Sequence, residues 1–128
     1  MARSVLLQLA RDSIEEVLEA KRKIDKASIL EMYPLLKEPV PTSIKIYLNN
    51  KPRGSSNEQS HNDTLIENII YNAKKAAFED KGYEPLSTSE YLSCEIEIEL
   101  KTPDGIMSEK DPAILETTSY SIEKELED

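Results

Sequence analysis

The chain has 128 residues, of which 38% are hydrophobic and 32% charged, and its formal net charge is −9. This length fits one domain with a modest core. The acidic balance argues against nucleic-acid binding, which needs a basic surface to displace counterions from phosphates. The only basic cluster comprises Lys21, Arg22, Lys23 and Lys26, and we expect it at the end of a helix, where cations complement the helix dipole.

Nearly all of the net charge lies in the last third of the chain. Residues 1–90 contain 14 acidic and 13 basic residues, whereas residues 91–128 contain 11 acidic and 3 basic residues. No apolar run reaches the length of a membrane span or a signal peptide, and the single Cys94 excludes an internal disulfide. We therefore expect a soluble, cytoplasmic domain over residues 1–115 and an acidic tail, 116–128, that is a frayed helix or disordered.

The first helix is predicted from Val5 to about Lys21, because apolar residues recur there at spacings of three and four. Arg11 is assigned to the polar side of this helix, together with the neighbouring acidic residues. A short helix is predicted over Ala27–Tyr33, where Ser28 has the position of an N-cap.

The middle of the chain predicts a strand, a turn and the second main helix. Ser43–Leu48 alternates apolar and polar residues, as a half-buried strand does, and Asn49-Asn50 suits a tight hairpin turn. The next residues, "RGSSNEQ", have no apolar side chain to bury, so the second hairpin strand is not expected to pack like the first. Thr64–Asp80 has a broad apolar stripe and a capping pattern at its start, and it predicts a helix.

The sequence "CEIEIEL", Cys94–Leu100, is the clearest strand in the chain. Its glutamates alternate with aliphatic residues, which favours a solvated sheet face over a metal site, because alternate strand residues lie about 7 Å apart. Ser87 and Glu90 have the spacing of a capped turn of helix before the strand. Thr102–Gly105, "TPDG", predicts the turn after it.

No segment contains a complete catalytic, metal or nucleotide motif, so an enzyme activity is unsupported and no metal or cofactor is predicted. Cys94 shares its strand face with aliphatic residues and is interpreted as a buried, unreactive thiol. His61 is the only histidine, and no cysteine pair exists with which it could form a common zinc site.

The stretch "NAKKAAFEDKGYEPLSTSEYLSCEIEIEL" resembles the AMMECR domain family. Members carry a helix ending in A-A-F-x-D, an aromatic residue and P-L, then S/T-x-x-E and an acidic-aliphatic strand, and the first helix is also similar, so the resemblance runs from about Leu6 to Leu115. The matching residues are Ala76, Ala77, Phe78, Asp80, Tyr83, Pro85, Leu86, Ser87, Glu90, Glu95, Ile96, Glu97 and Ile98.

The family motif L-R-G-C-I-G is expected just after the hairpin turn, where this chain reads "PRGSSN". Arg53 and Gly54 match, whereas Ser55 stands at the place of the cysteine and Asn57 at that of the last glycine. No thiol chemistry is therefore available there. A further glycine-rich, L-P-Q-V-containing portion of the family is not found after Leu115, so the chain resembles a shortened, diverged member.

The resemblance implies an α+β fold, with an antiparallel sheet backed by two main amphipathic helices. It implies no established biochemical activity. Family domains often accompany a MEMO-type protein and a radical-SAM-type protein, and this association implies an accessory role with a protein partner.

Two interpretations of residues 51–63 stay open. In the first they form a solvated loop, with Gly54–Ser60 as the most mobile internal segment. In the second they form a binding site, in which Arg53, Gly54, Ser55, Asn57 and His61 face the N-terminus of the 64–80 helix and hold a small anion.

Two functions from different classes are accordingly considered. The first is a non-catalytic binding or accessory module. The second is an enzyme that acts on a small anionic substrate through the Arg53 loop. The sequence defines neither the ligand nor the oligomeric state.

Overall fold

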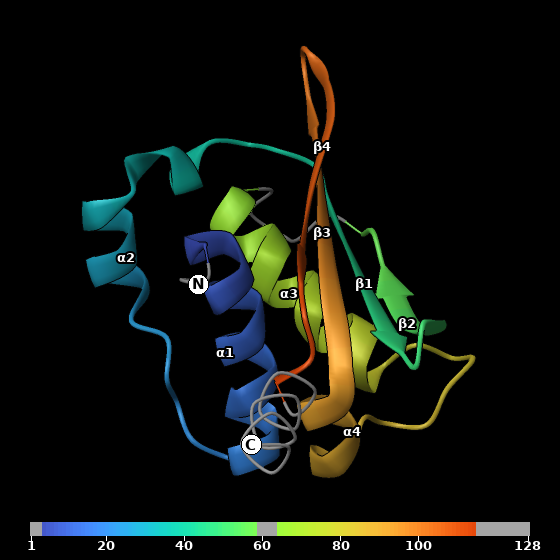
Figure 1. Cartoon of the computed structure of the whole chain (residues 1–128). Coiled ribbons are helices and arrows are strands. Elements are labelled where there is room, and N and C mark those ends of the chain that lie inside the picture. The colour runs from blue at the N-terminus through green and yellow to red at the C-terminus, as the bar shows by residue number, and fades with distance from the viewer. Residues whose placement is uncertain (1–3, 59–63, 115–128) are drawn as a thin grey trace, which may run out of the picture.

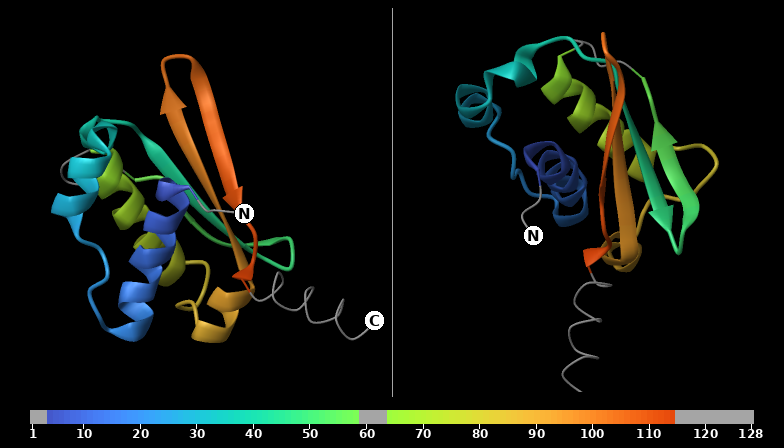
Figure 2. Two further views of the ribbon diagram at one scale, coloured as in Figure 1. Left: turned by 60° about the vertical axis from the view of Figure 1, so that its left-hand side comes forward. Right: turned by 45° about the horizontal axis from the view of Figure 1, so that its top comes forward.

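The protein is built around one antiparallel sheet with the strand order β2-β1-β3-β4 (Figures 1 and 2). The computed structural model describes residues 4–58 and 64–114. Two long helices, α1 and α3, lie against one face of the sheet. In chain order the elements are α1 Val5–Glu19, α2 Lys26–Met32, the 3-10 helix η1 Pro34–Lys37, β1 Thr42–Leu48, β2 Lys51–Ser56, α3 Leu65–Phe78, α4 Thr88–Ser93, β3 Cys94–Thr102 and β4 Gly105–Asp111. The expected α+β fold is confirmed.

The core lies between the sheet and the two long helices. On the helix side, β1 places Ile44 opposite Ile98 and Ile46 opposite Ile96 of β3, and all four side chains are buried. From α3, Ile69 is fully buried against this layer. The periodicities that predicted these elements therefore also assigned their apolar faces correctly.

The opposite face of the sheet is polar, as the alternation of β3 predicted. Glu95, Glu97 and Glu99 are half-buried there, and Lys45 binds Glu99 with 2.6 Å between Nζ and Oε1. The Tyr47 hydroxyl donates a hydrogen bond to Glu97. Among residues 4–58 and 64–114, no group of three histidine, cysteine or acidic side chains is arranged to hold a metal ion.

Helix termini follow capping chemistry, with one correction. Ser4 and Thr64 are the N-caps of α1 and α3, and each accepts a hydrogen bond from the backbone three residues later. The cap of α2 is Asp25 rather than Ser28, because the Asp25 carboxylate accepts hydrogen bonds from both the backbone and the hydroxyl of Ser28. Ala20, with φ of 52°, ends α1 before the basic cluster.

The expectation of a loop at Gly54–Ser60 is wrong for Gly54–Ser56, which belong to β2 and pair with β1. The helix-facing positions of β2 are Gly54 and Ser56, and these contact α3 without needing apolar side chains. These small residues let α3 approach β2 closely, and the hydrogen bond of Ser56 with Asn72 takes the place of apolar packing. The lack of apolar residues therefore did not mean that this segment was a loop. Asn57 and Glu58 follow the end of β2 and belong to no strand, as expected, and residues 59–63 lie outside the described part of the chain.

Both hairpin turns are where the sequence placed them. Asn49 and Asn50 adopt φ of 55° and 63°, the left-handed pair that joins β1 to β2. The turn between β3 and β4 ends at Gly105, with φ of 127°. The strand β4 itself was not predicted, because its apolar Ile106 and Met107 are adjacent and therefore lie on opposite faces.

The assignment of a core face and a polar face predicts that substitutions on the two faces differ in their cost to stability. Ile69→Ala should lower the free energy of unfolding by about 2–5 kcal/mol, because it leaves a cavity in the core. Glu97→Ala, on the polar face, should cost no more than about 0.5 kcal/mol. Urea unfolding of both variants measures the difference, and equal losses would contradict the assignment of the two faces.

Candidate functional site

Arg53 lies at a bulge in β2 that directs its side chain away from the regular alternation. Ile46 pairs with Gly54 and Tyr47 with Pro52, so Arg53 is the extra residue. Its guanidinium group binds both carboxylate oxygens of Glu90, at 3.0 Å each. It also donates to the Glu84 carbonyl at 2.8 Å and lies over the Tyr83 ring.

This placement differs from the expected anion site at the start of α3. Arg53 lies against the segment that follows the C-terminal end of that helix. Its charge is already neutralised by Glu90, and its side chain is only 11% exposed. Arg53 takes this position because Glu90 is fixed by the capping box with Ser87 at the start of α4. Both carboxylate oxygens of Glu90 thereby face the guanidinium group of Arg53.

The ion pair makes a pH prediction. The hydrogen bond from Arg53, followed by that from the Ser87 N–H, lowers the pKa of Glu90 from 4.5 to about 2. A carboxylate whose pKa is lower in the folded state stabilises the fold above its unfolded pKa, and this contribution is lost as the pH falls through the folded value. Between about pH 4.5 and pH 2, the stability of Glu90→Gln should therefore fall less steeply than that of the parent protein. Urea unfolding across this range measures both slopes, and identical slopes would contradict the pairing.

Gly54 and Ser55 hold β2 to the end of α3. A Cβ atom on Gly54 would lie 2.1 Å from the Ala76 carbonyl oxygen, so only glycine fits. The Ser55 N–H donates to Asp80 at 2.9 Å, and the Gly82 N–H donates to the other oxygen of the same carboxylate. These hydrogen bonds lower the pKa of Asp80, and the one from Gly82 has the larger effect.

Asn72 holds the end of β2 to the middle of α3, and the sequence analysis did not single it out. It is fully buried, and its side-chain oxygen accepts from the Ser56 hydroxyl at 2.6 Å and from the Glu58 N–H at 3.0 Å. Its amide nitrogen donates to the carbonyls of Glu58 and Thr42. The available signal was an asparagine within the apolar stripe of a helix.

A groove of about 630 Å³ runs from β2 across the polar face of the sheet. Its lining includes Ser55, Ser56 and Asn57, acidic and basic side chains of α3 and the sheet, and Ile106 of β4. Two of its lysines are paired, Lys45 with Glu99 and Lys75 with Glu58. Within the described part of the chain, the other two, Lys81 and Lys101, form no ion pair.

The groove offers hydrogen-bond donors and acceptors together with unpaired ammonium groups. Asn57 is exposed in it, and Ser55 is exposed beside Asp80. Of the site residues expected from the sequence, Ser55 and Asn57 line the groove. Arg53 and Gly54 are not part of its lining, and their contacts hold β2 in place. His61 lies outside the described residues.

The family model AMMECR1 matches residues 7–122 of the chain. This chain belongs to the AMMECR1 family. Among solved structures it is similar to the uncharacterized protein PH0010 from Pyrococcus horikoshii, with 25% sequence identity and a TM-score of 0.66. That match covers 77% of this chain and 50% of the other, so the protein spans about half the length of this relative. No curated protein matches the chain.

The residues that match the AMMECR1 pattern contact one another across the fold. Besides the pair of Arg53 with Glu90, the Leu86 N–H donates to the Ala77 carbonyl at 2.8 Å, and Leu86 is buried. Phe78 packs half-buried on the core, and Pro85 is exposed. Most of the matched residues therefore fix the position of β2 and the 79–90 segment.

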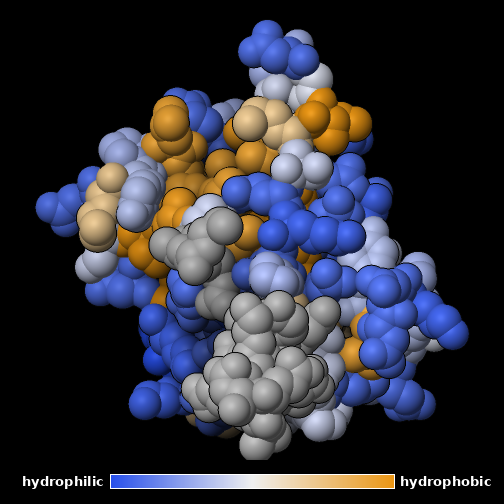
Figure 3. Space-filling view, in the orientation of Figure 1, coloured by the Kyte–Doolittle hydropathy of each residue, from blue (hydrophilic) through white to orange (hydrophobic). Residues whose placement is uncertain are grey.

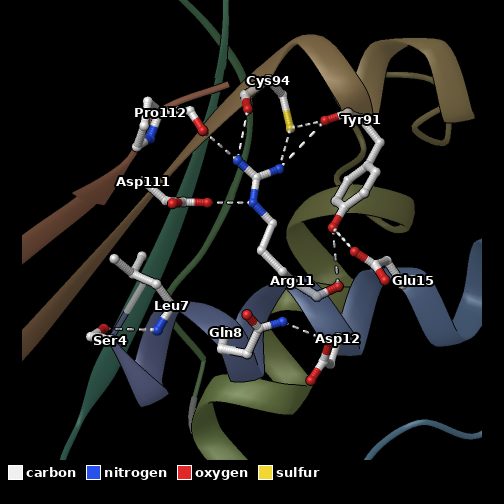
Figure 4. A network of polar contacts seen from close by, with 10 residues as sticks. All are labelled: Ser4, Leu7, Gln8, Arg11, Asp12, Glu15, Tyr91, Cys94, Asp111 and Pro112. Atoms are coloured by element: carbon white, nitrogen blue, oxygen red, sulfur yellow. Dashed lines mark hydrogen bonds and ion pairs between the residues drawn. The ribbon is translucent and has the colours of Figure 1, made fainter. Parts of the chain in front are cut away.

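A second polar cluster is buried near the start of β3, and it corrects the assignment of Arg11 to the polar side of α1 (Figure 4). Arg11 is fully buried, with Nε 2.6 Å from an Asp111 oxygen. Its Nη2 donates to the carbonyls of Cys94 and Pro112 at 3.0 Å each, and its Nη1 donates to the Tyr91 carbonyl at 3.4 Å. The Tyr91 hydroxyl closes the cluster by donating to Glu15, which lies on α1.

Cys94 is fully buried beside Arg11, as its position on β3 predicted. Burial raises the pKa of its thiol, although the neighbouring guanidinium group opposes this effect. A buried thiol with a raised pKa is a poor nucleophile. The cluster joins α1, α4 and the sheet, and the low reactivity of the thiol stays a prediction.

Within residues 4–58 and 64–114, no helix combines the length and the apolar character that crossing a membrane requires. The acidic segment 116–128 lies outside the described residues, so its frayed or disordered state stays a prediction.

Proposed function

We propose that this AMMECR1-family protein is a non-catalytic binding module that works with a partner protein through the groove beside β2. The observation that carries the proposal is that the residues at the place of the family motif fall into two groups, one in contact with the rest of the protein and one exposed. Arg53 and Gly54 are occupied by contacts within the protein, whereas Ser55 and Asn57 are exposed in the groove. The groove thus presents polar side chains that suit recognition.

The partner's chemistry follows from the lining. Lys81 and Lys101 attract acidic side chains or a small anion, and the Asn57 amide and Ser55 hydroxyl can donate hydrogen bonds to either. MEMO-type and radical-SAM-type proteins are the proposed partners, on the ground of their association with the family. The cytoplasm is the proposed compartment, because the single cysteine is a free thiol.

The alternative, an enzyme that uses Arg53 to bind a small anionic substrate, has lost its main support. The guanidinium group of Arg53 already donates two hydrogen bonds to Glu90, and it does not lie at the N-terminus of α3. An anion would have to displace a carboxylate that is fixed by its own helix cap.

The test is an association measurement by isothermal titration calorimetry, with a MEMO-type and a radical-SAM-type protein of the same organism. Ser55→Tyr fills the groove without disturbing the core, and it should weaken the association about tenfold or more, equivalent to about 1.4 kcal/mol. Ser89→Tyr, at an exposed position of α4 outside the groove, is the matched control and should leave the affinity unchanged.

Absence of binding to both proteins would refute the proposed partners. Binding that Ser55→Tyr leaves intact would show that the partner uses a different surface.

A further inference from the structure

The groove beside β2 ends, on the far side of the sheet, at an ammonium group and an apolar side chain. Lys101 of β3 lies opposite Ile106 of β4, and both residues line the groove. Directly opposite residues of an antiparallel pair point to the same face, with Cβ atoms about 5 Å apart. Ile106 is 66% exposed, and Figure 3 shows apolar surface on the β3–β4 hairpin at the top of the view, next to hydrophilic surface. This end of the groove therefore offers a cation and an apolar contact side by side.

The charge of Lys101 is available to a ligand. Lys101 is exposed, and within the described part of the chain it forms no ion pair. The neighbouring carboxylate of the lining on β3, Glu99, is bound to Lys45 at 2.6 Å. Asp104, in the turn after β3, is not part of the lining. An acidic group that enters this end of the groove therefore meets a cation that no lining carboxylate has neutralised.

The end of the groove beside α3 is less favourable to an acidic group. Lys81 lies there, but it directly follows Glu79 and Asp80, and both of these carboxylates also line the groove. Two carboxylates thus offset one ammonium group. The positive charge that the groove offers is therefore concentrated at Lys101.

The groove is long enough for several residues of an extended chain. Ser55 of β2 lies opposite Lys45 of β1, which lies opposite Glu97 of β3. Lys101 is four residues further along β3. Two strand spacings of about 4.8 Å and four residues of about 3.3 Å each place Ser55 and Lys101 about 16 Å apart. An extended chain of about five residues covers this distance, which a small carboxylic acid does not.

We propose that the groove recognises an extended segment of the partner protein in which an apolar residue and an acidic residue stand two positions apart. The apolar residue packs on Ile106, and the acidic residue binds Lys101. Residues two positions apart in an extended chain point to the same side, about 7 Å from each other, as these two contacts require. Uncharged polar residues beyond the acidic one bind the exposed side chains of Asn57 and Ser55. This inference rests on the proposed function, because it specifies what the groove binds.

The contacts must act together to hold such a segment. An exposed ion pair alone changes an affinity by no more than about fivefold. The apolar contact with Ile106 and the hydrogen bonds at the β2 end of the groove add to it. A small acid reaches only the Lys101 end, so a polypeptide fits the groove better.

The experiment titrates the isotope-labelled full chain with the peptide TLTETSTST, acetylated and amidated so that its ends carry no charge. In the first control peptide, TLTQTSTST, an amide replaces the acidic group. In the second, TSTETSTLT, the composition is kept but the apolar and acidic residues stand four positions apart. We expect chemical-shift changes at the groove lining with the first peptide, and binding about fivefold weaker with each control. Added salt should reduce the difference between the first peptide and its amide control.

Variants of the protein test the two contacts separately. Lys101→Gln and Ile106→Ser should each weaken binding of the first peptide about fivefold. Lys51→Gln, at an exposed position of β2 outside the lining, and Met107→Ser should leave binding unchanged. Met107 is 61% exposed and adjacent to Ile106, but it lies on the opposite face of the sheet.

The inference is overturned if the first peptide does not shift the resonances of the groove lining, if the control peptides bind equally well, or if the control variants lose as much affinity. Isocaproate, which combines an apolar group with a carboxylate, would overturn it by binding as tightly as the peptide. If Ser55→Tyr weakens association with the partner protein while Lys101→Gln and Ile106→Ser do not, this inference fails and the proposed function stands. Association that Ser55→Tyr leaves intact would refute the proposed function itself.

Discussion

Gly54→Ala should lower the free energy of unfolding by about 3 kcal/mol, although the change adds a single methyl group. The new Cβ would lie 2.1 Å from the Ala76 carbonyl oxygen, and the contact is with backbone, which cannot rotate away. Either β2 moves off α3 or the helix shifts. Both movements strain the hydrogen bonds of Ser55 with Asp80 and of Ser56 with Asn72. Urea unfolding measures the loss.

Gly82→Ala is the matched control. A Cβ at Gly82 would lie 3.4 Å from an Asp80 carboxylate oxygen, which is ordinary van der Waals contact with a movable side chain. Its backbone does not have positive φ, so alanine introduces no strain there. This variant should change stability by less than about 0.5 kcal/mol. Comparable losses in the two variants would mean that β2 does not pack against α3 as described.

The glycine also explains which parts of the site could be predicted from sequence. The R-G pair of the family motif pointed to this stretch, and both residues have structural reasons: Arg53 binds Glu90, and Gly54 makes room for Ala76. The direction of the Arg53 side chain could not be predicted. It depends on a bulge in the pairing with β1 and on a helix cap that lies 37 residues away in sequence.

Prediction of the β-strands from sequence was limited in the same way, because contacts with distant segments hold the edge strands. Alternation over Cys94–Leu100 defined β3 and its buried face, because the strand is central and has a helix layer on one side only. β2 and β4 are edge strands, where burial is lower and alternation is weak. β2 is held by Asn72 and Asp80 of distant segments, and β4 by its pairing with β3. Neither contact leaves a local periodic signal.

Arg11 marks the largest difference between pattern and structure in α1. Its charge placed it among the acidic residues of the polar side, yet it is fully buried. The residues that make this burial tolerable come from the other end of the chain: Asp111, and the carbonyls of Cys94 and Pro112. A single-helix pattern contains no information about partners about 100 residues away. The periodicity was therefore correct for the apolar stripe and wrong for this position.

Arg11→Met should destabilise the protein by about 3–5 kcal/mol, because it leaves the Asp111 carboxylate in a buried position without its cation. Methionine has a similar length and packs well, so the loss reflects charge and hydrogen bonding rather than a cavity. Arg22→Met, at an exposed position after α1, should cost less than about 0.5 kcal/mol.

The double variant Arg11→Met/Asp111→Leu separates the two contributions. If the loss arises because the Asp111 carboxylate is buried without the Arg11 cation, removing the carboxylate should restore part of the stability, since apolar pairs can replace buried ion pairs. The carbonyls of Cys94 and Pro112 would still lack their donor, so recovery should be incomplete. Urea unfolding of the parent, the two single variants and the double variant forms a closed cycle. A double variant as unstable as the sum of the single ones would show that Arg11 acts through its carbonyl contacts, and that its ion pair with Asp111 adds little to the fold.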